Sequence, residues 1–280
     1  MLAAVGLFSL MDAGLKVLST RYPPFQVAAL RGAASLPFVL GWTLYSIGPR
    51  TLLRVRWGLH LMRGAMGVLM MAAFVYALRG LPLTTAYTLF FIAPLMIAAL
   101  SVPVLGERVG PRRWVAIVIG FVGVLVVMRP TGEGMTTLAG LAVLLSATGY
   151  AVSAITVRVL ARTDSTQAMV FWLMLCIALG AGALAWPQWR PIDGAHLGLI
   201  AAVGLAGALG QYTVTEAFRH GEASSIAPLE YTALVWGVAL DYGLWGVLPD
   251  TVTWAGAAII VGSGIYLIHR ERVHAEAEHP

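Results

Sequence analysis

Seven ionisable side chains lie within long apolar stretches of this chain, and their types suit binding of charged groups more than bond-breaking chemistry. They are Asp12, Lys16, Arg31, Arg63, Glu216, Glu230 and Asp241. A charge in a lipid-like environment costs about 2.5–3.5 kcal/mol on insertion scales. Such residues therefore tend to face an interior cavity, where they can hold a charged solute or a proton.

Asp12 and Lys16 are four residues apart, so on a helix their side chains share one face and can meet. One interpretation is a binding or proton site deep in the molecule. The other is an ion pair that only lowers the cost of insertion. Burial favours the neutral form of Asp12, whereas the Lys16 ammonium group favours its charged form. The sequence therefore leaves open whether Asp12 takes up and releases a proton during transport.

A second group of candidates lies further along the chain. Glu230 and Asp241 are eleven residues apart, which brings a helix back to nearly the same direction, so both are expected on one face. We predict that Glu230 lines the cavity, and that Asp241 either lines it or reaches the outer surface. Tyr87, Tyr150 and Trp236 fall near the middle of apolar stretches and are candidate cavity residues.

The other charged residues are expected to have simpler roles. Arg63 falls near the end of an apolar stretch, where it could reach lipid phosphates. Glu216 is expected to snorkel or to pair with Arg219. Arg31 is expected to pair with a carboxylate or a carbonyl group.

Motifs for catalysis and cofactor binding are absent from the sequence. No HExxH, GxSxG or Walker A pattern occurs, and the six histidines fall at stretch ends, in loops or in the C-terminal tail. The single cysteine, Cys176, can form neither an internal disulfide nor a thiolate metal cluster. We therefore predict no enzyme activity, no catalytic residue, no metal and no cofactor.

The composition is that of a membrane protein. Of 280 residues, 59% are hydrophobic and 11% are charged, and the mean hydropathy is +0.82. A soluble domain carries about 25% charged residues. The net charge of +5 comes from scattered arginines rather than from basic blocks. This pattern gives no reason to expect a nucleic-acid partner, and indicates membrane lipid instead.

Breaks at charged residues, Pro and Gly predict ten all-α membrane spans. Their expected ranges are 1–19, 24–46, 58–78, 84–105, 112–129, 135–160, 167–187, 195–218, 223–247 and 252–269. Loops on the side of the N-terminus then hold eleven Arg residues and those on the other side hold four. This bias predicts that both termini are cytoplasmic. Pro94 lacks a backbone N–H and is a candidate hinge within the fourth span.

The two halves of the chain repeat each other at an offset of 140 residues. Residues 77–80 (ALRG) align with 217–220 (AFRH), Gly106 aligns with Gly246, and Trp114 aligns with Trp254. An odd number of spans in each half inverts the second copy, as in many transporters. We predict repeats over 1–130 and 131–270, followed by a polar tail over 271–280 that is expected to be disordered.

Several segments resemble the EamA domain of the drug/metabolite transporter superfamily. They are residues 76–86 (YALRGLPLTTA), 92–95 (IAPL), 105–108 (LGER) and the glycine-rich 120–124 (GFVGV), together with Leu30-Arg31-Gly32 and Trp114. The second copy has Gly246-Val247 where the family often has Gly-Glu. The resemblance implies a central cavity lined by spans 1, 3, 4, 6, 8 and 9, with spans 5 and 10 at the edge.

The resemblance implies a secondary transporter of small organic metabolites in the bacterial inner membrane, working by alternating access. Similarity to YddG-type exporters favours export of amino acids, including aromatic and hydrophobic ones. One alternative is uptake of S-adenosylmethionine, riboflavin or a similar metabolite, which the opening residues 8–16 also favour. Another is a lipid scramblase or flippase. The expected partners are a small-molecule substrate and membrane lipid, and the sequence leaves open whether protons also bind. The chain is expected to be a monomer or a homodimer.

Overall fold

The computed structural model describes residues 1–46, 48, 50–53, 55–105, 111–128, 134–220 and 227–278. Within these ranges the chain forms helices and no strands. The helices are α1 (Leu2–Ser19), α2 (Pro24–Ser46), α3 (Arg50–Leu53), α4 (Trp57–Leu78), α5 (Leu83–Phe90), α6 (Ile92–Leu105), α7 (Pro111–Met128), α8 (Gly134–Leu160), α9 (Thr166–Ala185), η1 (Trp186–Gln188), η2 (Gly194–His196), α10 (Leu197–His220), η3 (Ala227–Thr232), α12 (Ala233–Trp245) and α13 (Thr251–Glu278).

Seven stretches of the described chain are long and apolar enough to cross a membrane. They are Leu2–Ser19, Pro24–Ser46, Trp57–Leu78, Leu83–Val104, Leu138–Leu160, Thr166–Gln188 and Gly194–His220. Shorter apolar helices cover Val118–Val127 and Thr251–Ser263. The chain is thus a multi-pass membrane protein. Every predicted span contains a helix, but the count of ten and the inverted repeat remain predictions.

Two of the predicted spans are interrupted rather than continuous. The fourth is divided between α5 and α6 at Phe91, three residues before Pro94. Because proline has no N–H, it cannot donate to the carbonyl group four residues earlier, that of Phe90, and the helix breaks nearby. The described part of the ninth, from Ala227 on, is the 3₁₀ segment η3 followed by α12. The site where Glu230 lies is therefore irregular backbone, which changes the spacing expected between Glu230 and Asp241.

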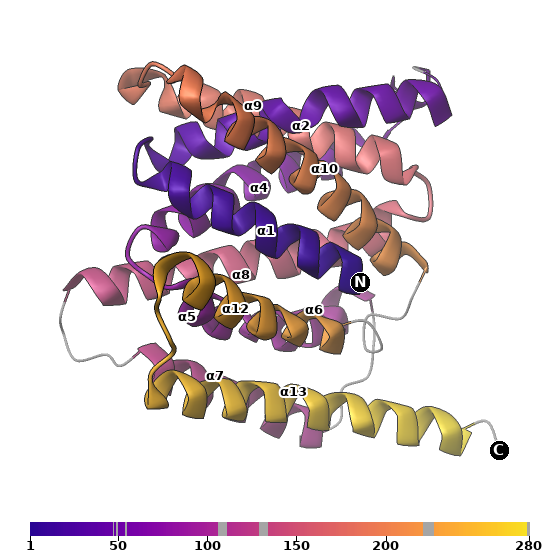
Figure 1. Cartoon of the computed structure of the whole chain (residues 1–280). Coiled ribbons are helices and arrows are strands. Elements are labelled where there is room, and N and C mark those ends of the chain that lie inside the picture. Colours follow the sequence, from indigo (N-terminus) through magenta and orange to yellow (C-terminus); the bar gives the residue numbers. More distant parts are fainter. Residues whose placement is uncertain are drawn as a thin grey trace.

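The helices run side by side as a bundle (Figure 1). The upper part in this view contains α2, α9 and α10, while α1, α4 and α8 cross the middle and α5, α6 and α12 lie below them. The pair α7 and α13 packs together at the lower edge, as expected for spans 5 and 10. The start of α1 and the end of α13 both lie toward the right-hand end.

Glycine allows the closest approach between two of these helices. A methyl group at Gly204 on α10 would lie 2.5 Å from the carbonyl carbon of Ala34 on α2. Ser35 donates a hydrogen bond to the Gly204 carbonyl across the same contact (2.8 Å). The backbones therefore touch directly, as in other glycine-mediated membrane interfaces. The small residue in the eighth predicted span therefore has a packing role.

The C-terminal end of the chain differs from expectation. The sequence around 271–278 is helical as part of α13, so the prediction of disorder was wrong there. Alanine, glutamate and arginine in this segment all favour helix.

At Gly246, which follows α12, φ is +66°, and the N–H groups of Gly246 and Val247 donate to the carbonyl oxygens of Tyr242 and Asp241. The left-handed conformation of Gly246 and its bond to the Tyr242 carbonyl form an αL motif, which ends α12. The Gly106-Glu107 motif lies outside the described residues.

Candidate functional site

A cavity lies in the middle of the bundle, at the helices predicted to surround it. Its walls come from α1, α4, α5, α8, α10, η3 and α12, with one further residue, Arg31, from α2. It holds about 860 Å³ of space free of protein atoms, its open part included. Concave, mostly apolar spaces with a few polar side chains are typical ligand sites, so this cavity is the candidate binding site.

Asp12 lies in this cavity and is held by a tyrosine. The Tyr87 hydroxyl group on α5 donates a hydrogen bond to Asp12 Oδ2 (3.0 Å). The Arg31 guanidinium group lies close enough for its charge to attract the Asp12 carboxyl group, and its Nε contacts Met11 Sδ (3.0 Å). These residues are buried, with Asp12 only 6% exposed. They form a polar patch on an otherwise apolar wall.

Glu230 forms a similar pair with a tyrosine from another helix. The Tyr150 hydroxyl group on α8 donates to Glu230 Oε1 (2.8 Å), and both side chains line the cavity. Phe90 packs against the Tyr150 ring with the centroids 5.4 Å apart. The cavity thus presents two buried carboxyl groups, each bound by one tyrosine, among aromatic and methionine side chains.

A smaller pocket adjoins the cavity and contains Arg63. Met70, Tyr150, Gln211 and Val214 line both spaces, so the two are neighbours. Arg63 donates from Nε to Ser153 Oγ and from Nη1 to the Met169 carbonyl oxygen, both at 2.9 Å. Its side chain is 2% exposed. The expectation that Arg63 reaches lipid phosphates is wrong, because α8 and α9 supply its acceptors inside the bundle.

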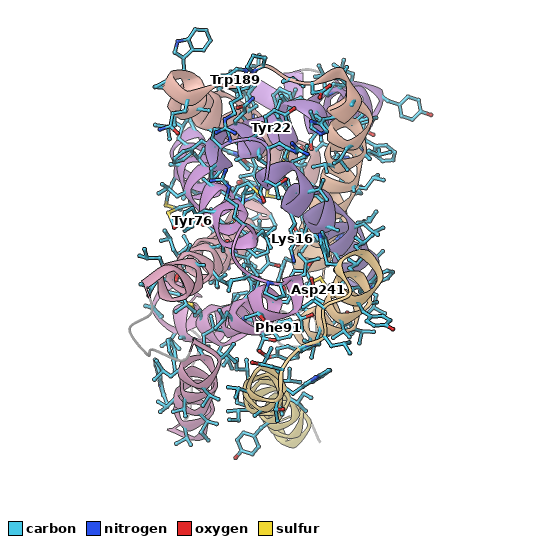
Figure 2. All side chains as sticks on the ribbon, turned by 60° about the vertical axis from the view of Figure 1, so that its left-hand side comes forward. Lys16, Tyr22, Tyr76, Phe91, Trp189 and Asp241 are labelled. Atoms are coloured by element: carbon cyan, nitrogen blue, oxygen red, sulfur yellow. The ribbon has the colours of Figure 1, made fainter. Side chains whose placement is uncertain are left out.

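The end of the bundle away from the N-terminus is closed by a charged cluster. Lys16 Nζ lies 3.2 Å from Asp241 Oδ1 and sits over the Trp245 ring. Asp241 also accepts hydrogen bonds from the N–H groups of Leu83 and Thr84 (3.0 and 2.7 Å) and from Thr84 Oγ1 (2.8 Å). Figure 2, turned so that this end comes forward, shows Lys16 beside Asp241, above Phe91. We call Lys16, Asp241 and Thr84 the closing cluster.

The closing cluster corrects two expectations. Lys16 pairs with Asp241 rather than with Asp12, because α12 brings a carboxylate that lies closer than the one on the same helix. Asp241 neither lines the cavity nor reaches the outer surface. It is 1% exposed and accepts from the free N–H groups at the start of α5, where the positive end of the helix dipole favours a carboxylate.

The cavity reaches the opposite end of the bundle. Met1, Ala4 and Val5 at the start of α1 line it, as does Glu230 within η3. In Figure 1 the start of α1 lies at the right, whereas Lys16 and Ser19 follow at its left-hand end. The cavity therefore extends toward the end that carries the N-terminus, and the closing cluster lies beyond its other end.

Four of the six candidate cavity residues do line the cavity, namely Asp12, Tyr87, Tyr150 and Glu230. Lys16 lies beyond it in the closing cluster. Trp236 lies outside as well, because its side chain is 41% exposed and covers Gly6 of α1. Pro94 stands in the first turn of α6, next to the break at Phe91. Their roles in binding or movement remain predictions.

Sequence reasoning missed Arg31 and Arg63 as residues of the site. Both were recognised as charges inside apolar stretches, but each was assigned by its depth along one helix. Their actual partners come from other helices. Of the two alternatives for Glu216, pairing with Arg219 is wrong: Glu216 pairs with His220 (3.1 Å), while Arg219 bonds to Asp164 and Thr166. Among the described residues no group of three His, Cys, Asp or Glu could hold a metal ion.

Comparison with known protein families gives a clear match. The family described as EamA-like transporter family matches residues 1–129 and 137–269. A solved structure described only as a crystal structure of a protein has a TM-score of 0.66 and 21% identity. That match covers 94% of this chain and 93% of the other, and supports the fold alone.

Three curated relatives have different named substrates. An S-adenosylmethionine uptake transporter of Rickettsia felis is 30% identical, over 96% of this chain and 90% of its own. The pseudopaline exporter CntI of Pseudomonas aeruginosa is 30% identical, over 93% and 91%. A riboflavin transporter of Vibrio cholerae is 29% identical, over 99% and 94%. These relatives share a transport role but not one substrate or one direction.

Proposed function

The chain belongs to the EamA-like transporter family, and from this premise we propose that it carries a small organic metabolite across the membrane by alternating access. The observation that carries the proposal is the central cavity, which holds buried carboxyl groups and extends toward one end of the bundle, with the closing cluster beyond the other. A carrier needs a site that is exposed to one side at a time. The break between α5 and α6 beside the cavity is also typical of carrier binding sites.

The proposed substrate is an amino acid, including aromatic and hydrophobic ones, or an amino-acid derivative such as S-adenosylmethionine. Phe8, Phe74, Phe90 and Phe91 offer apolar surface for a side chain or a ring, and the buried carboxyl groups and arginines offer charge for a zwitterion. The names of the relatives include uptake transporters and an exporter. An alternating-access carrier is reversible, so export or uptake follows the gradients.

The remaining features of the proposal concern placement in the cell. We expect the bacterial inner membrane, with both termini cytoplasmic, so that the cavity is accessible from the cytoplasm. Residues 1–130 and 131–270 would be the two inverted repeats that move against each other. Protons would compete with the substrate at Asp12 if that carboxyl group is neutral in the empty carrier. A monomer or a homodimer would satisfy this scheme.

Solute counterflow in proteoliposomes tests the proposal. Vesicles with purified protein are loaded with unlabelled L-phenylalanine, L-methionine, S-adenosylmethionine or riboflavin, and then diluted into the labelled solute. A carrier produces transient, saturable accumulation of its own substrate. Protein-free vesicles and the variant Ser146→Trp, which fills the cavity, are the controls.

A channel would give flux without counterflow, and a lipid scramblase would move labelled lipid but none of these solutes. Either result would contradict the proposal. The Ser146→Trp protein is checked for monodisperse elution, so that loss of transport reflects a blocked cavity rather than an unfolded chain.

A further inference from the structure

We propose that Arg63, Tyr150 and Glu230 together bind the head group of an α-amino acid. In this arrangement the Arg63 guanidinium group takes the ligand's carboxylate, and Glu230 takes its ammonium group. The ligand's side chain then lies in the main cavity toward Asp12. This inference rests on the proposed function and assigns the residues that bind the head group of its substrate.

Arg63 is a buried cation without an anionic partner in the described structure. Its two hydrogen bonds go to Ser153 Oγ and to the Met169 carbonyl oxygen, which orient the guanidinium group but do not neutralise it. Among the described residues no carboxylate forms an ion pair with it. A buried charge is costly unless it is paired. The planar fork of arginine fits a carboxylate well, so a ligand carboxylate is a suitable partner.

Glu230 supplies the complementary group. One of its oxygens accepts from Tyr150, and its side chain lines the main cavity. A carboxylate has several acceptor positions, so Glu230 can receive an ammonium group while it keeps the tyrosine hydroxyl. Tyr150 stands between the two charges, since it lines both spaces and its hydroxyl bonds to Glu230.

The two opposite charges are anchored at neighbouring positions of α8. Arg63 bonds to Ser153, and Glu230 bonds to Tyr150, which is three residues earlier on α8. Residues three apart on a helix are neighbours, with Cβ atoms about 5–6 Å apart. The ammonium and carboxylate groups of an α-amino acid are attached to the same carbon atom. We therefore expect one ligand that spans the two adjoining spaces to contact both anchors.

The rest of the cavity defines the side chain that would follow. Met70, Met71, Phe74, Phe90 and Phe91 form apolar walls next to the proposed head-group site. Asp12 lies at the other polar patch, where it could attract a second positive charge. A methionine or phenylalanine side chain fits the apolar part. S-adenosylmethionine adds a sulfonium ion and an adenine ring, whereas riboflavin has neither an ammonium nor a carboxylate group.

Ligand analogues that each lack one charge test the proposal. Binding of labelled L-methionine to the purified full chain is measured in competition with 3-(methylthio)propylamine and 4-(methylthio)butanoate. The amine lacks the carboxylate and the acid lacks the ammonium group. We expect each analogue to bind at least 10-fold more weakly than L-methionine, as for loss of a charged hydrogen bond.

Substitutions identify which residue meets which charge. Arg63→Gln should lower the affinity for L-methionine 10- to 100-fold. It should leave the affinity for the amine unchanged, because the amine has no carboxylate that Arg63 could bind. Glu230→Gln should lower the affinity for the amine and for L-methionine but leave the affinity for the acid unchanged. Arg190→Gln, at an exposed arginine of the loop after α9, is the matched control and should change none of the three.

Equal losses for the amine and for L-methionine in Arg63→Gln would mean that Arg63 only holds α4 against α8 and α9, and would overturn the proposal. If that variant does not fold, the wild-type analogue series decides, and equal binding of all three ligands would overturn the proposal as well. Saturable riboflavin counterflow that L-methionine does not inhibit would reject the head-group site but keep the transporter. Absence of counterflow for every solute would reject both.

Discussion

Asp241 shows how a single carboxylate can organise contacts among three helices. It joins Lys16 of α1 to the first N–H groups of α5, and is itself on α12. We expect Asp241→Ala to destabilise the protein by roughly 1–3 kcal/mol, because it leaves buried N–H groups and an ammonium group without an acceptor. Thermal unfolding in detergent, followed by loss of monodisperse protein, measures the change.

The control for this substitution is Asp193→Ala. Asp193 is exposed and accepts one local hydrogen bond from the Ala195 N–H group. An equal fall in unfolding temperature for both variants would show that Asp241 contributes no more than a surface carboxylate.

Asp164, in the turn between α8 and α9, predicts a pH dependence of stability. Burial of the Asp164 carboxyl group raises its pKa, but hydrogen bonds from Thr163, His60 and the Arg56 N–H group outweigh burial and hold the pKa below its ordinary value. The folded state therefore binds the proton less readily than the unfolded state. Its contribution to stability is present above the unfolded pKa, about 3.9, and is lost as the pH falls through the lower folded pKa.

We therefore expect the wild type to lose a few degrees of unfolding temperature between pH 5 and pH 3 that Asp164→Asn does not lose. Unfolding curves of both proteins in the same detergent, taken at half-unit pH steps, make the comparison. Parallel curves across that range would mean that Asp164 does not carry the effect.

At the level of residues, the sequence predicted burial more successfully than it predicted contacts between side chains. The cost of charge in an apolar stretch identified Asp12 and Glu230, and mid-stretch position identified Tyr87 and Tyr150. Pairings failed because they were sought on the same helix, as with Asp12 and Lys16. The true partners come from helices 75 to 225 positions away. Spacing along one chain carries no information about such contacts.

Among the elements, the break between α5 and α6 has the clearest dynamic consequence. Pro94 removes a backbone hydrogen bond next to Phe91, which lines the cavity. We expect Pro94→Ala to stiffen this segment and to slow counterflow severalfold with little change in substrate affinity. Rates in proteoliposomes and equilibrium binding in detergent separate the two effects.

Pro103 provides the matched control, since it lies inside the same helix, is exposed and does not line the cavity. Pro103→Ala should transport like the wild type. If both variants slow transport equally, the break at Phe91 has no special part in movement. If Pro94→Ala changes affinity alone, Pro94 shapes the site and is not a hinge.

Helix ranges were the most predictable feature because apolar length and polar breaks determine them directly. The interruptions were harder. Pro94 marked the break before α6, but nothing in the sequence near Glu230 distinguished the 3₁₀ segment η3 from a regular helical turn. The helical end of α13 was missed because its charged residues were taken as a sign of disorder, although alanine and glutamate favour helix.

For the molecule as a whole, the closing cluster is expected to decide which end of the cavity is accessible. Opening the closed end requires α1 and α12 to separate, which breaks the contact between Lys16 and Asp241. We expect Lys16→Met to increase the population open at that end several-fold. The exchanged pair Lys16→Asp with Asp241→Lys should restore closure in part, because the attraction is recovered while the bonds to α5 are not.

A cysteine in the cavity reports this change. Ser146→Cys is introduced together with Cys176→Ser, which removes the native thiol, and membrane-impermeant maleimide is added to one side at a time. Lys16→Met should raise labelling from the side opposite the N-terminus. Arg21→Met, at an exposed cation just beyond α1, should leave labelling unchanged. Unaltered labelling in Lys16→Met would mean that the pair is not what holds this end closed.

The pairing of Lys16 with Asp241 also bears on the membrane potential. An elementary charge that crosses the full electric field of a membrane gains or loses about 2.3 kcal/mol per 100 mV. Equal and opposite charges that cross the same part of the field carry no net current even when their contact breaks, so this pair adds little voltage dependence when the empty carrier returns. Asp241→Asn would leave the ammonium charge uncompensated in the field. Imposing a potassium diffusion potential on proteoliposomes should then change the return rate of Asp241→Asn more than that of the wild type.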